Sequence, residues 1–172
     1  MRLFLAINFN DMTKAKLLAL RDDLCMRSKR GNFSLPENLH LTLVFLGECD
    51  MKQTSAIKAA MNEVSFKPFD LTVERIGRFK RGGGDVWWAG VRENKTLSSL
   101  QSDLTDKLTT AGFILDKRKY SPHITLGREV ITDISPWQIE PFTETLSSVD
   151  LMKSQRLGGK LTYTAIYERR GK

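Results

Sequence analysis

Short apolar runs and amphipathic helical patterns follow one another along the whole chain, without strict alternation of the two. Runs of strand character predict strands over residues 3–9, 40–46, 69–79, 86–91, 140–152 and 161–169, with one more beginning after Pro122. Apolar side chains at helical spacing predict three helices, which begin at the capping residues Asn10 and Asp11, Asp50, and Asn94. This mixed order favours an α+β domain with largely antiparallel sheets over a doubly wound parallel sheet.

The connecting segments follow from the same pattern. The first helix should end before Gly31, and residues 33–38, which contain a proline, should form a loop that leads into the strand at His40. The basic, glycine-rich residues 80–85 match neither the Walker pattern nor the dinucleotide-binding glycine pattern, and they predict a flexible turn. No linker or low-complexity stretch interrupts the chain, so we expect one domain over residues 1–172 with two lobes.

Composition narrows the class of protein. With 172 residues, of which 41% are hydrophobic and 27% charged, the chain can bury a sizeable core without disulfides or a structural metal. A net charge of +7 favours an anionic partner, with nucleic acid first and an acidic membrane surface second. No apolar run reaches the roughly 18 residues that a membrane span needs. Cys25 and Cys49 form neither a disulfide framework nor a zinc-site pattern, so we expect a cytoplasmic protein.

The only two histidines of the chain occupy the same short motif. The two segments are His40-Leu41-Thr42-Leu43 and His123-Ile124-Thr125-Leu126. Successive side chains of a strand point to opposite faces, so each histidine shares a face with its threonine while the apolar residues pack on the other side. Two such strands lying side by side would present two imidazoles and two hydroxyls to one groove.

This set of groups suits displacement at the phosphorus of a cyclic diester. One imidazole can take a proton from water while the other gives a proton to the leaving sugar oxygen, because imidazole titrates close to neutrality. The threonine hydroxyls can hold phosphate oxygens in line with both rings. Packing within a strand is the common alternative for either motif alone, but their repetition on a basic chain favours catalysis. Two histidines paired with threonines offer no usual ligand spacing, so we expect no metal and no cofactor.

Two longer segments carry a family resemblance. Residues 36–48, Pro-Glu-Asn-Leu-His-Leu-Thr-Leu-Val-Phe-Leu-Gly-Glu, and residues 120–128, Tyr-Ser-Pro-His-Ile-Thr-Leu-Gly-Arg, resemble the two signature motifs of the 2H phosphoesterase superfamily. Within it, the chain is most similar to the bacterial and archaeal RNA 2',3'-cyclic phosphodiesterases, long called 2'-5' RNA ligases. The similarity extends over nearly the whole chain and includes the opening Arg-Leu-Phe-Leu-Ala-Ile and the closing strand pair.

The resemblance implies a bilobal, pseudo-twofold α+β fold whose two histidine strands face each other across a central cleft. It also implies hydrolysis of 2',3'-cyclic phosphate ends of RNA, such as tRNA halves, to 2'-phosphomonoesters, with 2'-5' ligation as the reverse reaction. By motif position, the expected catalytic residues are His40, Thr42, His123 and Thr125. Because the 3' oxygen leaves, we assign His40 as general acid and His123 as general base. We expect a monomer that needs no membrane and no protein partner.

Four further residues are candidates for substrate binding: Arg118, Tyr120, Arg128 and Phe33. A guanidinium offers phosphate a planar, permanently charged fork, although a solvated surface charge is the alternative for both arginines. The odd spacing of Arg128 from Thr125 should place it on the opposite face unless the strand ends or bulges. Phe33 stands where many relatives carry a tryptophan and Tyr120 where they carry a phenylalanine, so base stacking at the cleft edge depends on these two positions.

Two other functions remain open from the sequence. The same fold could act on 2'-5'-linked oligonucleotides or on small cyclic nucleotides. Alternatively, a non-catalytic RNA-binding protein could hold phosphate in the cleft without turnover. Lysine and arginine would serve binding better than paired histidines and threonines, which disfavours the second alternative.

Overall fold

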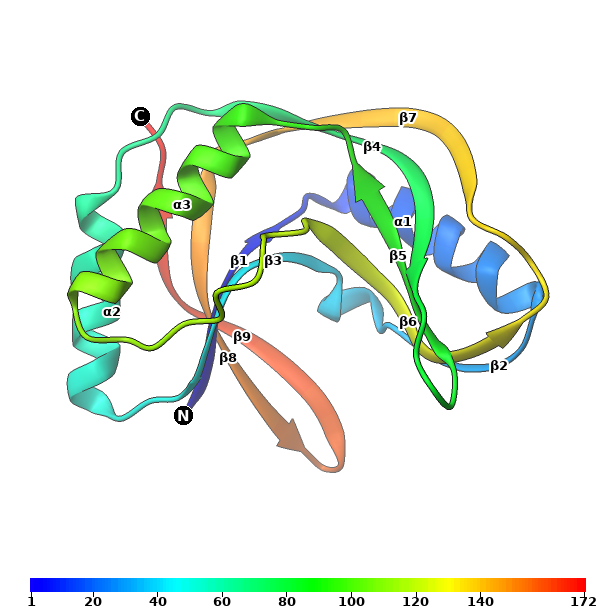
Figure 1. Ribbon diagram of the computed structural model, residues 1–172, viewed down its shortest axis with the longest axis horizontal. Coiled ribbons are helices and arrows are strands. Elements are labelled where there is room, and N and C mark those ends of the chain that lie inside the picture. The colour runs from blue at the N-terminus through cyan, green and yellow to red at the C-terminus, as the bar shows by residue number, and fades with distance from the viewer.

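The chain folds into two antiparallel β-sheets with three α-helices (Figure 1), as a computed structural model of all 172 residues describes. The first sheet contains, in spatial order, β3 (His40–Glu48), β1 (Arg2–Asn8), β8 (Ser148–Leu157) and β9 (Lys160–Arg170). The second sheet contains β2 (Ser28–Phe33), β6 (His123–Thr132), β5 (Asp85–Val91), β4 (Phe69–Phe79) and β7 (Trp137–Leu146). The predicted α+β class with antiparallel sheets is therefore confirmed.

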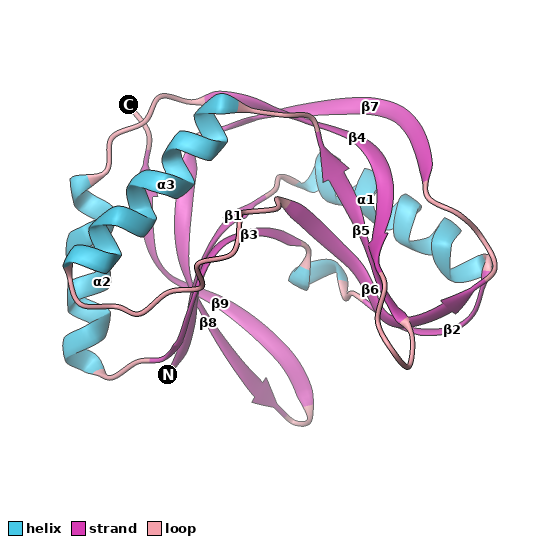
Figure 2. Ribbon diagram, viewed as in Figure 1, coloured by secondary structure: helices cyan, strands magenta, loops and turns pink.

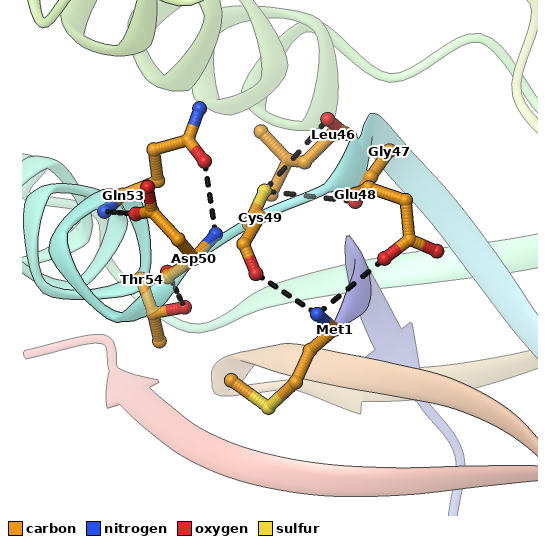
Figure 3. Close-up of polar contacts among 8 residues, drawn as sticks. All are labelled: Met1, Leu46, Gly47, Glu48, Cys49, Asp50, Gln53 and Thr54. Carbon is orange, nitrogen blue, oxygen red and sulfur yellow. Dashed lines mark hydrogen bonds and ion pairs between the residues drawn. The ribbon is translucent and has the colours of Figure 1, made fainter.

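The helices begin at the capping residues that the sequence predicts. They are α1 (Asp11–Met26), α2 (Met51–Glu63) and α3 (Lys95–Thr110). The side chains of Asn10 and Asn94 each accept a backbone N–H three residues on, at 2.8 and 3.0 Å. Asp50 and Gln53 form a reciprocal capping box at the start of α2, as Figure 3 shows. None of these helices is long and apolar enough to cross a membrane.

The helices cover only one face of each sheet, which leaves the other faces for the site (Figure 2). Helix α1 packs against the second sheet, whereas α2 and α3 pack against each other and against the first sheet. The buried side chains form one main core, in which Leu41 of β3 and Ile124 of β6 are completely inaccessible. Because strand side chains alternate, burying these two residues turns their neighbours in sequence to the uncovered faces.

The edge strand β2 was not predicted from the sequence. Helix α1 ends at Met26, earlier than the expected limit before Gly31, and Ser28–Phe33 then pairs antiparallel with β6. This segment, Ser-Lys-Arg-Gly-Asn-Phe, is mostly exposed and so lacks the apolar alternation that marks a half-buried strand. The expected loop over residues 33–38 contains a short 3₁₀ helix, η1 (Pro36–Asn38), which leads into β3 as predicted.

The single strand predicted over residues 140–152 was wrong, because the chain changes sheets within it. Strand β7 ends at Leu146 on the outer edge of the second sheet, and β8 begins at Ser148 inside the first sheet. Both parts have strand character, so hydrophobicity alone does not reveal the break at Ser147. Pro141 lies in β7, in keeping with its position on an edge strand.

Candidate active site

Both histidine motifs line one cavity of about 870 Å³. His40 and Thr42 come from β3 of the first sheet, and His123 and Thr125 come from β6 of the second sheet. In each motif the apolar residue between histidine and threonine is completely buried on the helix-covered face. Strand alternation therefore turns both polar pairs to the cavity, and the structure brings together the four residues that the sequence singles out.

The ring of His40 is held at both nitrogens. Nδ1 lies 2.8 Å from the carbonyl oxygen of Asn38, and Nε2 lies 2.8 Å from Oγ1 of Thr42. A carbonyl oxygen can only accept a hydrogen bond, so Nδ1 carries the proton of the neutral ring, and the Thr42 hydroxyl then donates to Nε2. The rings of Phe4 and Tyr163 pack beside it, with centroid distances of 5.0 and 5.2 Å. These contacts leave the imidazole one orientation, with the basic nitrogen next to a hydroxyl.

His123 is held at one nitrogen only. Its Nδ1 lies 2.7 Å from the carbonyl oxygen of Ser121, which fixes the same tautomer as in His40. The ring of Phe79 meets it edge-on at a centroid distance of 5.0 Å, and the ring of Trp88 lies 6.3 Å away. No protein group forms a hydrogen bond with Nε2, so this nitrogen is free to exchange a proton with a ligand.

Burial shifts both imidazoles toward the neutral form. It lowers the pKa of His40 from 6.5 to about 4, a shift that the hydrogen bond to Asn38 opposes and the nearby positive charges of Arg128 and His123 reinforce. Burial also lowers the pKa of His123, and Arg128 again adds to the shift. A bound phosphate would raise the pKa of both rings, because its negative charge stabilises an imidazolium.

Arg128 lines the same cavity although its spacing from Thr125 is odd. The reason is a β-bulge in β6. Trp87 and Trp88 are consecutive on β5 but pair with Gly127 and Thr125, so β6 carries one extra residue at this point. The bulge buries two consecutive residues, Leu126 and Gly127, and returns the next side chain to the cavity face. This bulge meets the condition under which the sequence pattern places Arg128 on the face of Thr125.

The other three predicted binding residues lie in different surroundings. Phe33 lines the cavity at the end of β2. Tyr120 does not: its ring packs against the core, and its hydroxyl donates to the carbonyl oxygen of Thr42 at 2.8 Å. Arg118 is exposed and forms a bidentate pair with Asp116, with a shortest contact of 2.6 Å. Neither Tyr120 nor Arg118 lines the cavity, so the geometry gives them no direct contact with a ligand there.

Several cavity residues escaped the sequence analysis. They are Arg2, Phe45, Arg156 and Tyr163, all from the first sheet, together with Asn38. Asn38 orients His40 through its backbone, and its side chain donates to the carbonyl oxygen of Leu161 on β9 at 3.0 Å. Only strand pairing reveals Arg2, Arg156 and Tyr163, because nothing in the sequence says that β1, β8 and β9 belong to the same sheet as β3.

The site therefore offers two proton-transfer groups, two hydroxyls and an arginine around one cavity. Such a set can exchange protons with a nucleophile and a leaving group while a guanidinium and hydroxyls hold an anion between them. The structure contains no group of three or more His, Cys, Asp or Glu side chains that could hold a metal ion. Acid–base chemistry on an anionic substrate is one reaction that this arrangement of groups can support.

Comparison with known proteins gives the family of this chain. A family model described as the 2'-5' RNA ligase superfamily matches residues 11–156. The RNA 2',3'-cyclic phosphodiesterase of Archaeoglobus fulgidus is 34% identical over 151 residues, which cover 84% of this chain and 85% of the relative. The enzyme of the same name from Thermotoga maritima is 36% identical over 131 residues, covering 74% and 70% of the two chains.

Solved structures agree with the sequence comparison. The structure of E. coli LigT complexed with 3'-AMP has a TM-score of 0.85 at 25% identity, covering 99% of this chain and 97% of that chain. A protein of Thermus thermophilus shares the fold with a TM-score of 0.86 over 99% and 97% of the two chains, at 23% identity. With matches over most of the sequence and nearly all of the fold, the chain belongs to the 2'-5' RNA ligase superfamily.

Proposed function

We propose that this protein is an RNA 2',3'-cyclic phosphodiesterase that opens cyclic phosphate ends to 2'-phosphomonoesters. One observation carries the proposal: two His-x-Thr motifs from separate sheets line a single cavity, together with an arginine that has no carboxylate partner. The curated relatives bear the name of this activity, and the basic charge of the chain suits an RNA substrate. The proposed reaction needs only groups that the protein supplies.

In the proposed reaction, the cyclic phosphate lies between the two imidazoles. The basic imidazole takes a proton from water as the water oxygen forms a bond to phosphorus, and the second imidazole, protonated, gives its proton to O3' as the P–O3' bond breaks. The products are a 2'-phosphomonoester and a free 3'-hydroxyl, and a proton exchange with solvent resets both rings. Arg128 and the hydroxyl of Thr125 bind the non-bridging oxygens as negative charge develops on them. The Thr42 hydroxyl, which donates to Nε2 of His40 in the free protein, turns its proton to the phosphate and so leaves Nε2 to the water.

The electrostatics of the site favour one assignment of acid and base. The sequence-based assignment makes His40 the acid. However, a pKa of about 4 leaves His40 neutral near pH 7, and its Nε2 already accepts a hydrogen bond, as a base requires. We therefore propose the reverse order, with His40 as base and His123 as acid. The negative charge of a bound phosphate raises the pKa of His123, so that this ring can carry the proton that the leaving oxygen needs.

The same pair of residues could also open the cyclic phosphate with a different nucleophile. If a 5'-hydroxyl of RNA replaced water as the nucleophile, the product would be a 2'-5' linkage. Cleavage of 2'-5'-linked oligonucleotides would use the same proton transfers and is the main alternative activity. The two histidines disfavour a purely binding role, because phosphate binding alone needs fixed cations rather than neutral imidazoles.

The proposal is tested by incubating the protein with an oligoribonucleotide that ends in a 2',3'-cyclic phosphate, in the presence of EDTA. We expect conversion to the 2'-phosphomonoester, identified by ³¹P NMR or by comparison with synthetic 2'- and 3'-phosphate standards. The matched control substrate is a 2'-5'-linked oligonucleotide with a free hydroxyl end, which should react much more slowly. Absence of turnover with EDTA, restored by a divalent metal, would contradict the proposed mechanism, and faster cleavage of the control substrate would favour the alternative activity.

A further inference from the structure

A row of polar side chains crosses three strands of the first sheet next to His40. Arg2 of β1 pairs with Ser154 of β8, and Ser154 pairs with Tyr163 of β9. Directly paired residues of neighbouring strands place their side chains on the same face of a sheet. Arg156 follows two residues after Ser154 and therefore shares that face. All four residues line the cavity of the histidines, and we call them the β1–β8–β9 patch.

The cations of this patch have no carboxylate partner. Arg2 and Arg156 form no ion pair in the structure, and Arg156 makes one hydrogen bond, from Nη1 to the carbonyl oxygen of Gly159 at 3.1 Å. Glu48 is the one acidic residue that lines the cavity. Its carboxylate forms an ion pair with the amino group of Met1 (Figure 3), at a distance of 3.4 Å. The two guanidiniums are therefore available to an anionic ligand.

The hydroxyl of Tyr163 lines the same cavity as the guanidiniums and has no hydrogen-bond partner in the protein. Burial raises the pKa of this hydroxyl, and the positive charges of Arg128, Arg2 and Arg156 oppose the shift, so all three act on it across the cavity. The Tyr163 ring meets the His40 ring edge-on at 5.2 Å between centroids. An anion bound at the Tyr163 hydroxyl would thus lie beside the catalytic pair but outside it.

The rim of the cavity adds an aromatic side chain next to the patch. Phe45 of β3 is 68% exposed although it lines the cavity, and its ring lies 6.4 Å from that of Phe4. An exposed aromatic face beside positive charge is the usual composition of a surface that binds single-stranded nucleic acid, in which bases stack and cations hold the backbone. The cavity volume of about 870 Å³ lies near the top of the roughly 300–1,000 Å³ range of small-ligand pockets.

We propose that the β1–β8–β9 patch binds the phosphodiester on the 5' side of the cyclic phosphate, with Phe45 stacking on the adjoining base. The preferred substrate is then an RNA strand of two or more nucleotides rather than a mononucleoside cyclic phosphate. This inference rests on the proposed function, because the position of the cyclic phosphate at the histidines sets the position of its neighbour. Arg2, Ser154, Arg156 and Tyr163 would determine substrate length and take no part in proton transfer.

The test compares kcat/KM for three substrates that share the same terminal nucleoside. They are the mononucleoside 2',3'-cyclic phosphate, the dinucleotide with a 2',3'-cyclic phosphate end, and that dinucleotide with an uncharged methylphosphonate between its nucleosides. We expect the dinucleotide to exceed the mononucleoside by roughly tenfold or more, in line with a charge-assisted contact, and the methylphosphonate to lose most of this preference. Similar values for the dinucleotide and its methylphosphonate would overturn the inference.

Substitutions in the patch test whether it causes the preference for the dinucleotide substrate. Arg156→Ala and Arg2→Ala should each reduce the ratio of dinucleotide to mononucleoside kcat/KM roughly tenfold. The control is Arg92→Ala, which removes the same charge from an exposed arginine that pairs with Glu74 and lies outside the cavity, and it should keep the wild-type ratio. An unchanged ratio in both patch variants would refute the subsite.

A binding measurement separates this inference from the proposed function. If the wild-type protein hydrolyses none of the three substrates, the proposed function fails, and titration with dinucleotide 2'-phosphates then tests the patch alone. Tighter binding of the charged dinucleotide than of its methylphosphonate, lost in Arg156→Ala, would support the subsite. Equal affinity for the two dinucleotides would reject it.

Discussion

The two histidines have nearly identical sequence motifs but different surroundings. His40 lies deep between Phe4 and Tyr163, and its Nε2 accepts from its own motif threonine. His123 keeps Nε2 free of protein partners. The sequence could place each imidazole on the same face as a hydroxyl, because strand alternation depends on chain position alone. It could not assign the proton roles, since these depend on burial and on aromatic neighbours from other strands.

The shifted pKa of His40 makes a prediction about stability. Its pKa is about 4 in the folded protein and near 6.5 when exposed, so the unfolded chain binds more protons between these values. The free energy of unfolding should therefore fall as the pH drops through this window, by an amount on the order of 3 kcal/mol at pH 4. The His40→Gln variant has no imidazole at this position and should therefore not lose this part of the unfolding free energy. Titration of the carboxylates affects both proteins equally and cancels when the two are compared. Urea unfolding at pH 7 and pH 4 measures the difference, and parallel losses in the two proteins would contradict the shifted pKa.

Tyr120 supports the site from outside the cavity. Its hydroxyl joins the segment before β6 to the backbone of Thr42 in β3 and so ties the two motif strands together. Tyr120→Phe should destabilise the protein by about 1–2 kcal/mol, because a buried hydrogen bond is lost. Tyr167→Phe is the matched control, since that hydroxyl donates to the exposed side chain of Asn62 and its loss should cost roughly 0.5 kcal/mol or less. Equal unfolding free energies of the two variants in denaturant titrations would refute this role.

At the scale of elements, apolar periodicity and capping chemistry predicted the three helices and most strands. What the sequence left out were the irregular elements. Strand β2 is an exposed edge strand without an apolar face, and the bulge in β6 is set by pairing with β5 rather than by local residues. These two features place Phe33 and Arg128 in the cavity. The four residues proposed to be catalytic could be predicted from the sequence because regular strands present them, whereas Phe33 and Arg128 depend on these irregular elements.

The close approach of β4 and β5 behind His123 gives an element-scale prediction. The indole of Trp88 lies against Gly77, where an added Cβ would be 2.3 Å from the nearest ring atom. Gly77→Ala should displace Trp88 from beside His123, cost about 1–3 kcal/mol by overpacking and lower kcat. Gly82→Ala is the control, because no atom lies within 4 Å of its added Cβ. Thermal unfolding and cyclic phosphate turnover measure both effects, and a Gly77→Ala protein that matches Gly82→Ala in both would show that Trp88 does not hold the ring.

At the scale of the whole molecule, two sheets each contribute one His-x-Thr strand to a shared cavity. The first sheet adds a larger share of the wall, because β1, β8 and β9 extend its polar face beside His40. The chain reaches this arrangement by crossing from the second sheet to the first between β7 and β8, at Ser147. Strand β8 then pairs with β1, the first strand of the chain, and β9 pairs with β8. The β1–β8–β9 patch exists only through this return, and its two arginines, Arg2 and Arg156, lie 154 positions apart in sequence. Pairing between strands so far apart in sequence cannot be predicted from the local pattern of residues.

The central claim is that His40 and His123 transfer protons to and from one phosphate. The most direct measurement compares His40→Ala and His123→Ala on an ordinary 2',3'-cyclic phosphate and on an analogue in which sulfur replaces O3'. A thiolate can leave without receiving a proton, since an alkyl thiol has a pKa of about 8.5. We expect each variant to lose roughly 10²–10⁴-fold in rate on the ordinary substrate while circular dichroism shows an intact fold. On the sulfur analogue, His123→Ala should recover most of its rate and His40→Ala should not.

Recovery of His40→Ala instead of His123→Ala would make His40 the acid and His123 the base, as in the sequence-based assignment. Catalysis by this pair of histidines would still hold. Losses of only a few-fold on the ordinary substrate, or recovery of neither variant by sulfur, would contradict acid–base catalysis by these two residues.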